Sequence, residues 1–274
     1  CALPIYHKDG SKIGKTLLKV TDLSTDKGVQ NVGFEVRRGE IVGLAGLMGS
    51  GRTEVTRALF GIDKITGGKI ELNGKPYTPK SAKDAMNNAV ALVPEDRREQ
   101  GLVVSHSVRN NLTLTRLNEC ETSGLLSNKK IMQMAEDLIG RFSIKVDDPG
   151  APASRLSGGN QQKIVIAKWL GRDPDLLIMD EPTAGVDIGT KSEVLSRVTD
   201  FANQGKGVLF VSSELSEMIA VCDRYVVMKR GKVVAELSSE GIDTEADLQL
   251  AIQHAGSDDG TQSSNTPSNE AGKE

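Results

Sequence analysis

The chain contains a glycine-rich motif whose spacing suits phosphate binding. Residues 46–53 have the sequence Gly-Leu-Met-Gly-Ser-Gly-Arg-Thr, which fits the phosphate-binding loop pattern Gly-x-x-x-x-Gly-Lys-Ser/Thr at every fixed position except one. Glycines allow backbone N–H groups to turn onto phosphate oxygens, and the start of the following helix adds a partial positive charge. We therefore expect Gly46, Gly49, Ser50 and Gly51 to cradle phosphates.

The one departure in this motif is Arg52, which stands where the pattern has Lys. Lys carries a compact charge on a flexible stem, whereas Arg carries a planar fork that does not fit the same pocket by default. Thr53 follows and supplies a hydroxyl for Mg²⁺. These residues predict that nucleotide still binds and that hydrolysis is weak or absent.

Two adjacent carboxylates follow a second apolar segment. Residues 175–179 are predicted to form a buried strand, and Asp180 and Glu181 stand at its end. A hard cation prefers oxygen ligands, and a base for phosphate chemistry must lie near the γ-phosphate. We expect Asp180 to hold Mg²⁺ through water and Glu181 to polarise the attacking water.

A third motif lies between the first two. Residues 156–163 have the sequence Leu-Ser-Gly-Gly-Asn-Gln-Gln-Lys, and an amphipathic helical pattern follows over 163–170. Ser157 has the side chain of a good N-cap, and by itself it predicts only the start of a helix.

The three motifs in this order resemble the nucleotide-binding domain of ABC transporters, over about residues 17–237. The resemblance implies ATP and Mg²⁺ as ligands. It also implies that Ser157, Gly158 and Gly159 point at a γ-phosphate held by the other domain of a head-to-tail pair, and that the segment 184–187 crosses to that partner.

Two more positions differ from the usual pattern of this family. Glu95, after the predicted strand 89–93, stands where the family usually has a Gln that touches Mg²⁺ and water. Ser213, after the predicted strand 208–211, stands where the family has a His against the γ-phosphate. Together with Arg52, these residues predict a weakened site. Glu181 points instead to some retained hydrolysis, because a site that had lost hydrolysis completely would not need this carboxylate.

A narrower resemblance comes from the segments 94–98, 160–163 and 212–214. They resemble the C-terminal half of the tandem ATPases of bacterial monosaccharide importers of the ribose, xylose, arabinose and galactose type, although Ala184 stands where those proteins often have Arg. The resemblance implies three partners: an N-terminal ATPase domain in the same or a paired chain, transmembrane permease subunits, and indirectly a sugar-binding protein. It implies a peripheral location at the cytoplasmic face of the plasma membrane.

Three functions compete. The first is an ATPase half that drives sugar import. The second is a non-hydrolytic, degenerate nucleotide-binding module that completes the partner's site and couples to the permease. The third is a soluble ABC-type protein acting on ribosomes or DNA. No heptad pattern separates Arg52 from Ser157, which argues against the chromosome-binding type.

The predicted fold is α/β: an ABC-type P-loop ATPase domain with a mostly parallel core sheet, an antiparallel β subdomain and an inserted helical subdomain. Strands that alternate with helical segments predict a parallel sheet with helices on both faces. Asn73-Gly74 predicts a hairpin over 70–77. The other predicted strands lie at 17–23, 32–36 and 40–45, with a last hairpin over 226–234.

The predicted domain organisation has three parts. Residues 1–12 are interpreted as a non-native or linker segment, with the native protein expected to begin near Gly10 after an absent N-terminal half. Residues 13–255 form the ATPase domain, with a helical subdomain at about 97–160 that contains helices near 108–114 and 130–141. Residues 256–274 are polar and are expected to be disordered.

The segment 95–104 joins the sheet to the helical insert, and we expect it to link the site mechanically to the permease. A charged run of this kind is more often a solvated loop. Its position between two moving subdomains favours a hinge, with Gly101 giving backbone freedom.

Composition narrows the remaining possibilities. The chain has 274 residues, with 34 Lys and Arg against 37 Asp and Glu, a net charge of −3 that argues against nucleic acid as a main partner. Its hydrophobic content is 38% without a long apolar run, which predicts no membrane-spanning helix. Three widely spaced cysteines fit a reducing compartment.

Overall fold

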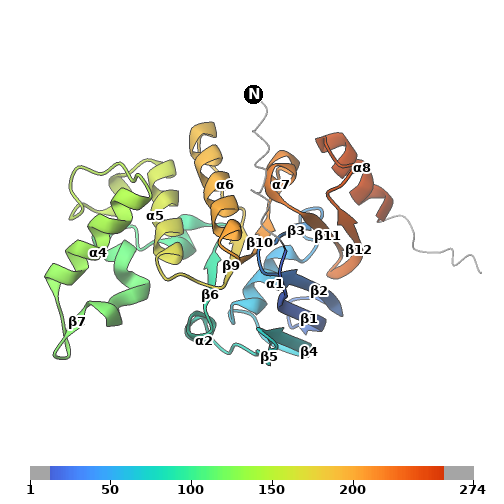
Figure 1. Ribbon diagram of the computed structural model, residues 1–274, viewed down its shortest axis with the longest axis horizontal. Helices are drawn as coiled ribbons and strands as arrows, with labels where there is room; N and C mark the ends of the chain where they lie inside the picture. Colours follow the sequence, from blue (N-terminus) through green and yellow to red (C-terminus); the bar gives the residue numbers. More distant parts are fainter. Residues whose placement is uncertain (1–12, 256–274) are drawn as a thin grey trace, which may run out of the picture.

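A computed structural model describes residues 13–255. The predictions for residues 1–12 and 256–274 lie outside the described residues. A central sheet carries α4 and α5 at one end and α7 and α8 at the other, with α6 between them (Figure 1).

The central sheet has the strand order β12-β11-β3-β10-β9-β6. All neighbours are parallel except β11 and β12, which form an antiparallel hairpin. The strands β3, β6, β9 and β10 are buried at every residue, because both faces of a parallel sheet are covered. The predicted parallel sheet is confirmed. Its strands are β3 Ile41–Ala45, β6 Val90–Val93, β9 Leu176–Asp180, β10 Gly207–Val211, β11 Arg224–Lys229 and β12 Lys232–Ser238.

A second, antiparallel sheet has the order β2-β1-β4-β5. Its strands are β1 Thr16–Thr25, β2 Val32–Arg37, β4 Ile65–Leu72 and β5 Lys75–Pro76. Asn73 (φ 53°) and Gly74 (φ 71°) turn β4 into β5 with two positive φ angles, the conformation that the Asn-Gly pair predicts. The two sheets meet closely at Gly207, where a Cβ would lie 2.6 Å from Leu17 Cδ2.

Helices cover the central sheet and extend beyond it. Their bounds are α1 Arg52–Leu59, α2 Ala82–Asn87, α3 Val108–Thr113, α4 Asn128–Arg141, α5 Gly158–Leu170, α6 Ile188–Asn203, α7 Leu215–Val221 and α8 Glu245–Ala255. The helices predicted near 108–114 and 130–141 are confirmed as α3 and α4. None of the helices described between residues 13 and 255 is both long and apolar enough to span a membrane.

The helix α5 differs from its predicted amphipathic pattern. It begins earlier, at Gly158, and its residues 164–169 are all buried. Trp169 packs edge-on against Phe60, with the ring centroids 5.4 Å apart. The helix lies between the sheet and the α3–α4 pair, so it has neighbours on more than one side.

Shorter elements complete the helical end. They are the π-helical turn η1 Arg97–Gly101, the 3₁₀ turns η2 Leu114–Cys120 and η3 Ala153–Arg155, and the strands β7 Glu121–Thr122 and β8 Leu125–Leu126. The β7–β8 hairpin escaped prediction because each of its strands has only two residues, too few to show an alternating pattern.

The prediction that Gly101 provides backbone freedom is wrong. Gly101 is buried at the end of η1, and a Cβ there would lie 2.9 Å from Val165 Cγ2 of α5. The glycine therefore permits close packing of η1 on α5. Residues 97–101 form a helical turn capped by Asp96, whose Oδ1 accepts the N–H groups of Arg98 at 2.8 Å and Glu99 at 3.1 Å.

Candidate functional site

The glycine loop joins β3 to α1 at the carboxyl edge of the parallel strands, where ligands of such sheets bind. Gly46 has φ 153°, and a Cβ there would lie 2.4 Å from the carbonyl oxygen of Met228. Gly51 has φ 103° and is the N-cap of α1. The hydroxyl of Ser50 is buried without a hydrogen-bond partner among the described residues. The loop therefore has the conformation that only glycine allows and an unused polar atom.

Thr53, Glu95 and Asp180 line one small pocket beside α1. They come from the first turn of α1, from the loop after β6 and from the end of β9. The sequence predicted Thr53 and Asp180 as Mg²⁺-binding residues and placed Glu95 where the family has a Gln that touches Mg²⁺, and the fold brings the three together. The remaining lining residues are Thr56, Arg57, Leu92, Pro94, Asp96 and Gln100.

The carboxyl group of Asp180 is nearly buried, with 2% of the residue exposed. Its Oδ2 accepts a hydrogen bond from Thr56 Oγ1 at 3.0 Å, while its Oδ1 has no partner among the described residues. Burial raises the pKa of Asp180 to about 6. A buried carboxylate oxygen without a donor suits a hard cation.

A cation here would depend on ligands from outside the protein. The described residues contain no group of three or more His, Cys, Asp and Glu side chains that could hold a metal. Mg²⁺ is commonly bound by one or two protein oxygens together with phosphates and waters. The pairing of Asp180 with Thr53 fits that mode.

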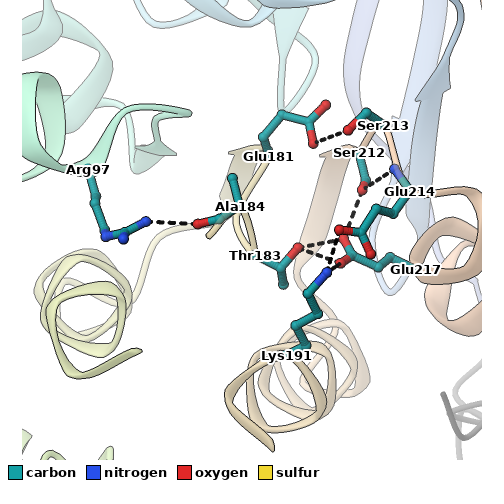
Figure 2. Close-up of polar contacts among 9 residues, drawn as sticks. All are labelled: Arg97, Glu181, Thr183, Ala184, Lys191, Ser212, Ser213, Glu214 and Glu217. Carbon is teal, nitrogen blue, oxygen red and sulfur yellow. Dashed lines mark hydrogen bonds and ion pairs between the residues drawn. The ribbon is translucent and has the colours of Figure 1, made fainter. Parts of the chain in front are cut away.

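Glu181 directly follows β9, in a backbone conformation with φ 47°. Its N–H donates to the carbonyl oxygen of Val211 at 2.9 Å, which fixes it against β10. Its Oε2 accepts a hydrogen bond from Ser213 Oγ at 3.1 Å (Figure 2). Burial raises the pKa of Glu181, although the Ser213 hydrogen bonds and Arg52 act against the shift.

Arg52 reaches across from the glycine loop to both neighbouring strand ends. Its Nη1 donates to the carbonyl oxygen of Ser212 at 3.1 Å. Its Nη2 lies 3.8 Å from Glu181 Oε1, and both side chains are mostly shielded from solvent. The fork of an arginine can hold two acceptors at once. The cation of the loop therefore faces the strand ends and Glu181.

Ser157, Gly158 and Gly159 lie at the start of α5 and have a different set of neighbours. Ser157 is exposed and caps the helix, because its Oγ accepts the backbone N–H of Asn160 at 3.4 Å. The same Oγ also accepts from Asn160 Nδ2 at 3.0 Å. A Cβ at Gly159 would lie 2.6 Å from Thr190 Oγ1, so only glycine fits there. The exposed Ser157 can be reached by a second molecule or domain.

Arg97 connects this region to the turn after Glu181, and the sequence did not single it out. Its Nη1 donates to the carbonyl oxygen of Ala184 at 2.8 Å (Figure 2), and its Nη2 lies 3.4 Å from that of Gly185. A Cβ at Gly158 would lie 2.8 Å from the same Nη2. The sequence of the charged segment 94–98 does not indicate which of its side chains packs against the rest of the protein.

Sequence reasoning also missed Thr56 and Glu217. Thr56 lies one helical turn after Thr53, and that i,i+3 spacing was a usable signal for a second hydroxyl on the same face. Glu217 is fully buried in α7. Nothing in the sequence distinguishes it from the exposed carboxylates around it.

A glycine loop between a parallel strand and a helix, beside a strand that ends in Asp-Glu, defines a nucleotide-binding ATPase domain. The family model described as ABC transporter matches residues 29–184, more than half of the chain, and the chain belongs to this family.

The curated relatives that match this chain include sugar-import proteins. A putative ribose/galactose/methyl galactoside import ATP-binding protein 1 of Rhizobium etli is 46% identical over 247 residues, covering 90% of this chain and 47% of the relative. The ribose import ATP-binding protein RbsA 2 of Streptomyces coelicolor is 41% identical, covering 94% of this chain and 52% of the relative. The ribose import ATP-binding protein RbsA of Geobacillus kaustophilus is 42% identical, covering 90% and 50%. The chain thus spans about half the length of these relatives.

Solved structures agree on the fold. An ATP-binding subunit of an ABC transporter matches with a TM-score of 0.67 and 25% identity, covering 86% of this chain and 94% of that one. A nucleotide-free ATP-binding cassette from an ABC transporter matches with a TM-score of 0.70 and 20% identity, covering 87% and 95%. The ABC ATPase fold is therefore confirmed.

Proposed function

We propose that this chain is the ATP-binding and ATP-hydrolysing C-terminal half of a subunit that energises import of a monosaccharide through an ABC transporter. The observation that carries the proposal is the meeting of Thr53, Glu95 and Asp180 in one pocket at the edge of the sheet, beside Glu181. The names of the relatives support sugar import, and their double length supports a tandem arrangement.

The chain's own groups would divide the binding of ATP and Mg²⁺ between them. The backbone N–H groups of residues 46–51 and the N-terminus of α1 bind phosphate oxygens, and Ser50 Oγ is free to add a hydrogen bond. Thr53 Oγ1 would bind the cation, Asp180 would hold it through water, and Glu95 would contact the cation and its water. Mg²⁺, when bound, neutralises charge that develops on the phosphates.

The proposed hydrolytic step uses Glu181 and Ser213. Glu181 accepts the proton of a water aimed at the γ-phosphate, and the raised pKa of this carboxyl makes it a better base than an exposed one. Ser213 holds the carboxylate in place through the 3.1 Å hydrogen bond and donates toward the γ-phosphate once that bond opens.

The alternative is a non-hydrolytic module that completes the partner's site and grips the permease. The ion pair of Arg52 with Glu181 favours it, because a facing cation opposes the burial that raises the pKa of this carboxyl and so lowers its proton affinity. In this reading Ser157 still acts, since it serves a nucleotide held by the partner.

The proposed partners follow from the family and the relatives. They are an N-terminal ATPase domain, transmembrane permease subunits that meet the helical region at about residues 97–160, and indirectly a sugar-binding protein. The chain would then lie peripherally at the cytoplasmic face of the membrane.

Two measurements on the purified chain separate the two readings. Equilibrium titration with ATP and Mg²⁺ tests binding, and phosphate release tests turnover. Release that depends on Glu181 supports the hydrolytic reading, and its absence in the presence of tight binding supports the alternative. Transport is tested by deleting the gene and measuring uptake of ribose, galactose, xylose and arabinose. Unchanged uptake of all four sugars contradicts sugar import.

A further inference from the structure

A buried carboxylate lies directly behind the site. Glu217 is 0% exposed, and its α7 side chain faces the segments that follow β9 and β10 (Figure 2). Thr183 Oγ1 lies 2.6 Å from both of its carboxylate oxygens. Ser212 Oγ donates to its Oε2 at 2.8 Å, and Lys191 Nζ lies 3.2 Å from its Oε1. One carboxylate thus ties three separate segments together.

Two of these donors are close in sequence to proposed site residues. Thr183 stands two residues after Glu181, and Ser212 stands immediately before Ser213. Glu181 and Ser213 are also hydrogen-bonded to each other. With the bonds of Glu217 to Thr183 and Ser212, this contact completes a ring of polar contacts that joins the ends of β9 and β10. Glu217 therefore braces the turn after Glu181 against the segment that carries Ser213, in addition to the hydrogen bond from Glu181 N–H to Val211.

The network is satisfied on every side, which makes it rigid. Ser212 also accepts the N–H of Glu214 at 3.0 Å, and Lys191 forms a further ion pair with Glu214. Thr183 and Ser212 are themselves buried. Fully paired polar networks in a low-dielectric interior fix one arrangement, whereas loss of one member leaves the others unpaired. A change at Glu217 is thus transmitted to both strand ends.

We propose that Glu217 is a positioning residue for hydrolysis, which holds Glu181 and Ser213 at their working separation through Thr183 and Ser212. The proposal rests on the hydrolytic function proposed above. Glu217 is too deep to touch nucleotide. A misplacement of a reacting group by about 1 Å costs on the order of a hundredfold in rate, so a small shift of this ring would slow turnover without weakening binding.

The central experiment compares Glu217→Gln with a matched buried carboxylate elsewhere. Glu40 is 2% exposed, pairs with Arg224 at 2.7 Å and lies before β3, at the opposite end of that strand from the glycine loop. We expect E217Q to lower kcat about tenfold or more with the KM for ATP–Mg²⁺ within about twofold of the unmodified chain. E40Q should lower the Tm comparably and leave kcat within about twofold.

Rescue at Thr183 separates positioning from general destabilisation. Thr183→Ser keeps the hydroxyl that donates to Glu217 and should retain kcat. Thr183→Val keeps the shape, removes the hydroxyl and should lose kcat as E217Q does. Since both residues act in one ring, the double variant T183V/E217Q should be no slower than E217Q. Unmodified kcat in E217Q, or equal losses in E217Q and E40Q, would overturn the proposal.

Hydrogen exchange decides the case in which the unmodified chain shows no turnover. The amides of Glu181 and Glu214, which donate to Val211 and Ser212, should exchange faster in E217Q. In E40Q the faster amide should be that of Arg37, which donates to Glu40 at 2.7 Å. If these amides exchange faster as expected but the unmodified chain shows no turnover, the proposed hydrolytic function is wrong. The structural role of Glu217 in holding the two segments is then still supported. Unchanged exchange at Glu181 and Glu214 in E217Q overturns the positioning itself.

Discussion

Arg52 Nη2 lies 3.8 Å from Glu181 Oε1, and the other arm of the same guanidinium donates to the carbonyl oxygen of Ser212 at 3.1 Å. The cation of the glycine loop is thereby directed at the proposed base. A lysine has one compact ammonium group and cannot hold both acceptors in a fork. The substitution at position 52 therefore changes the resting arrangement of the site as well as its charge geometry.

Slow turnover is the first consequence. The purified chain should bind ATP–Mg²⁺ and release phosphate more slowly than about 1 per second. Arg52→Lys should raise that rate severalfold, because the ammonium group would release Glu181 and reach toward the β- and γ-phosphates. Phosphate release under saturating ATP measures both rates.

Glu181→Gln provides the control for this experiment. It should reduce the rate of the unmodified chain and of Arg52→Lys to the same background, since both would use the same base. Turnover that is unchanged or slower in Arg52→Lys would show that the ion pair does not limit the site.

The buried carboxyl of Asp180 makes a second prediction, on pH. Its folded-state pKa of about 6 lies above the ordinary value of 3.8, so its protonated form favours folding. The corresponding stability is fully present below about pH 3.8 and is lost as the pH rises through about 6. Asp180→Asn mimics the protonated form and should stabilise the nucleotide-free chain at neutral pH by up to about 3 kcal/mol.

Thermal unfolding without Mg²⁺ checks this pH dependence. The Tm advantage of Asp180→Asn should be clear at about pH 7.5 and should shrink toward about pH 4. In the unmodified chain, Mg²⁺-dependent ATP binding should weaken as the pH falls below about 6, because metal ligands must be deprotonated. A Tm for Asp180→Asn below that of the unmodified chain at neutral pH would contradict the assignment.

The sequence predicted the parts of the site that lie on regular elements. Thr53 and Asp180 were placed because a glycine loop and an apolar strand fix their positions within one or two residues. Their convergence with Glu95 follows from the parallel sheet, in which the carboxyl ends of neighbouring strands meet at one edge.

What the sequence could not predict depends on side-chain direction in the folded state. The turn of Arg52 toward Glu181 and the burial of Glu217 follow from packing between segments that are distant in the chain. Gly101 is a further example. Its close contact with Val165 of α5 arises from tertiary packing, which the local sequence does not show, and the sequence therefore suggested backbone freedom instead.

A third prediction concerns the asymmetry between the two halves of a tandem transporter. In the full-length protein, Ser157→Arg should reduce sugar uptake more than Arg52→Ala does. Ser157 is exposed at the start of α5 and is proposed to close the partner's intact site, whereas Arg52 belongs to the site that we propose to be weakened. Ser154→Arg, at an exposed position just upstream, is the matched control and should leave uptake near normal. Equal losses for Ser157→Arg and Arg52→Ala would remove the asymmetry.

The last prediction concerns Arg97, which bridges η1 and the turn after Glu181. Its guanidinium donates to the carbonyl oxygen of Ala184 at 2.8 Å and lies against Gly158. In the chain it stands two residues after Glu95, which lines the pocket of the proposed nucleotide site. One side chain therefore joins the segment proposed to sense this chain's nucleotide to the segments proposed to serve the partner's.

Loss of this bridge should uncouple the two sites and leave binding intact. In the full-length protein, Arg97→Ala should lower sugar uptake about tenfold while the affinity of the isolated chain for ATP–Mg²⁺ changes less than about twofold. Arg98→Ala, at the neighbouring exposed position, controls for loss of charge in the same turn and should keep most of the uptake. Arg97→Lys should fall between them, since an ammonium group reaches one carbonyl oxygen where the guanidinium reaches two. If Arg97→Ala weakens ATP binding as much as it weakens uptake, Arg97 acts on its own nucleotide site and the bridge has no separate role.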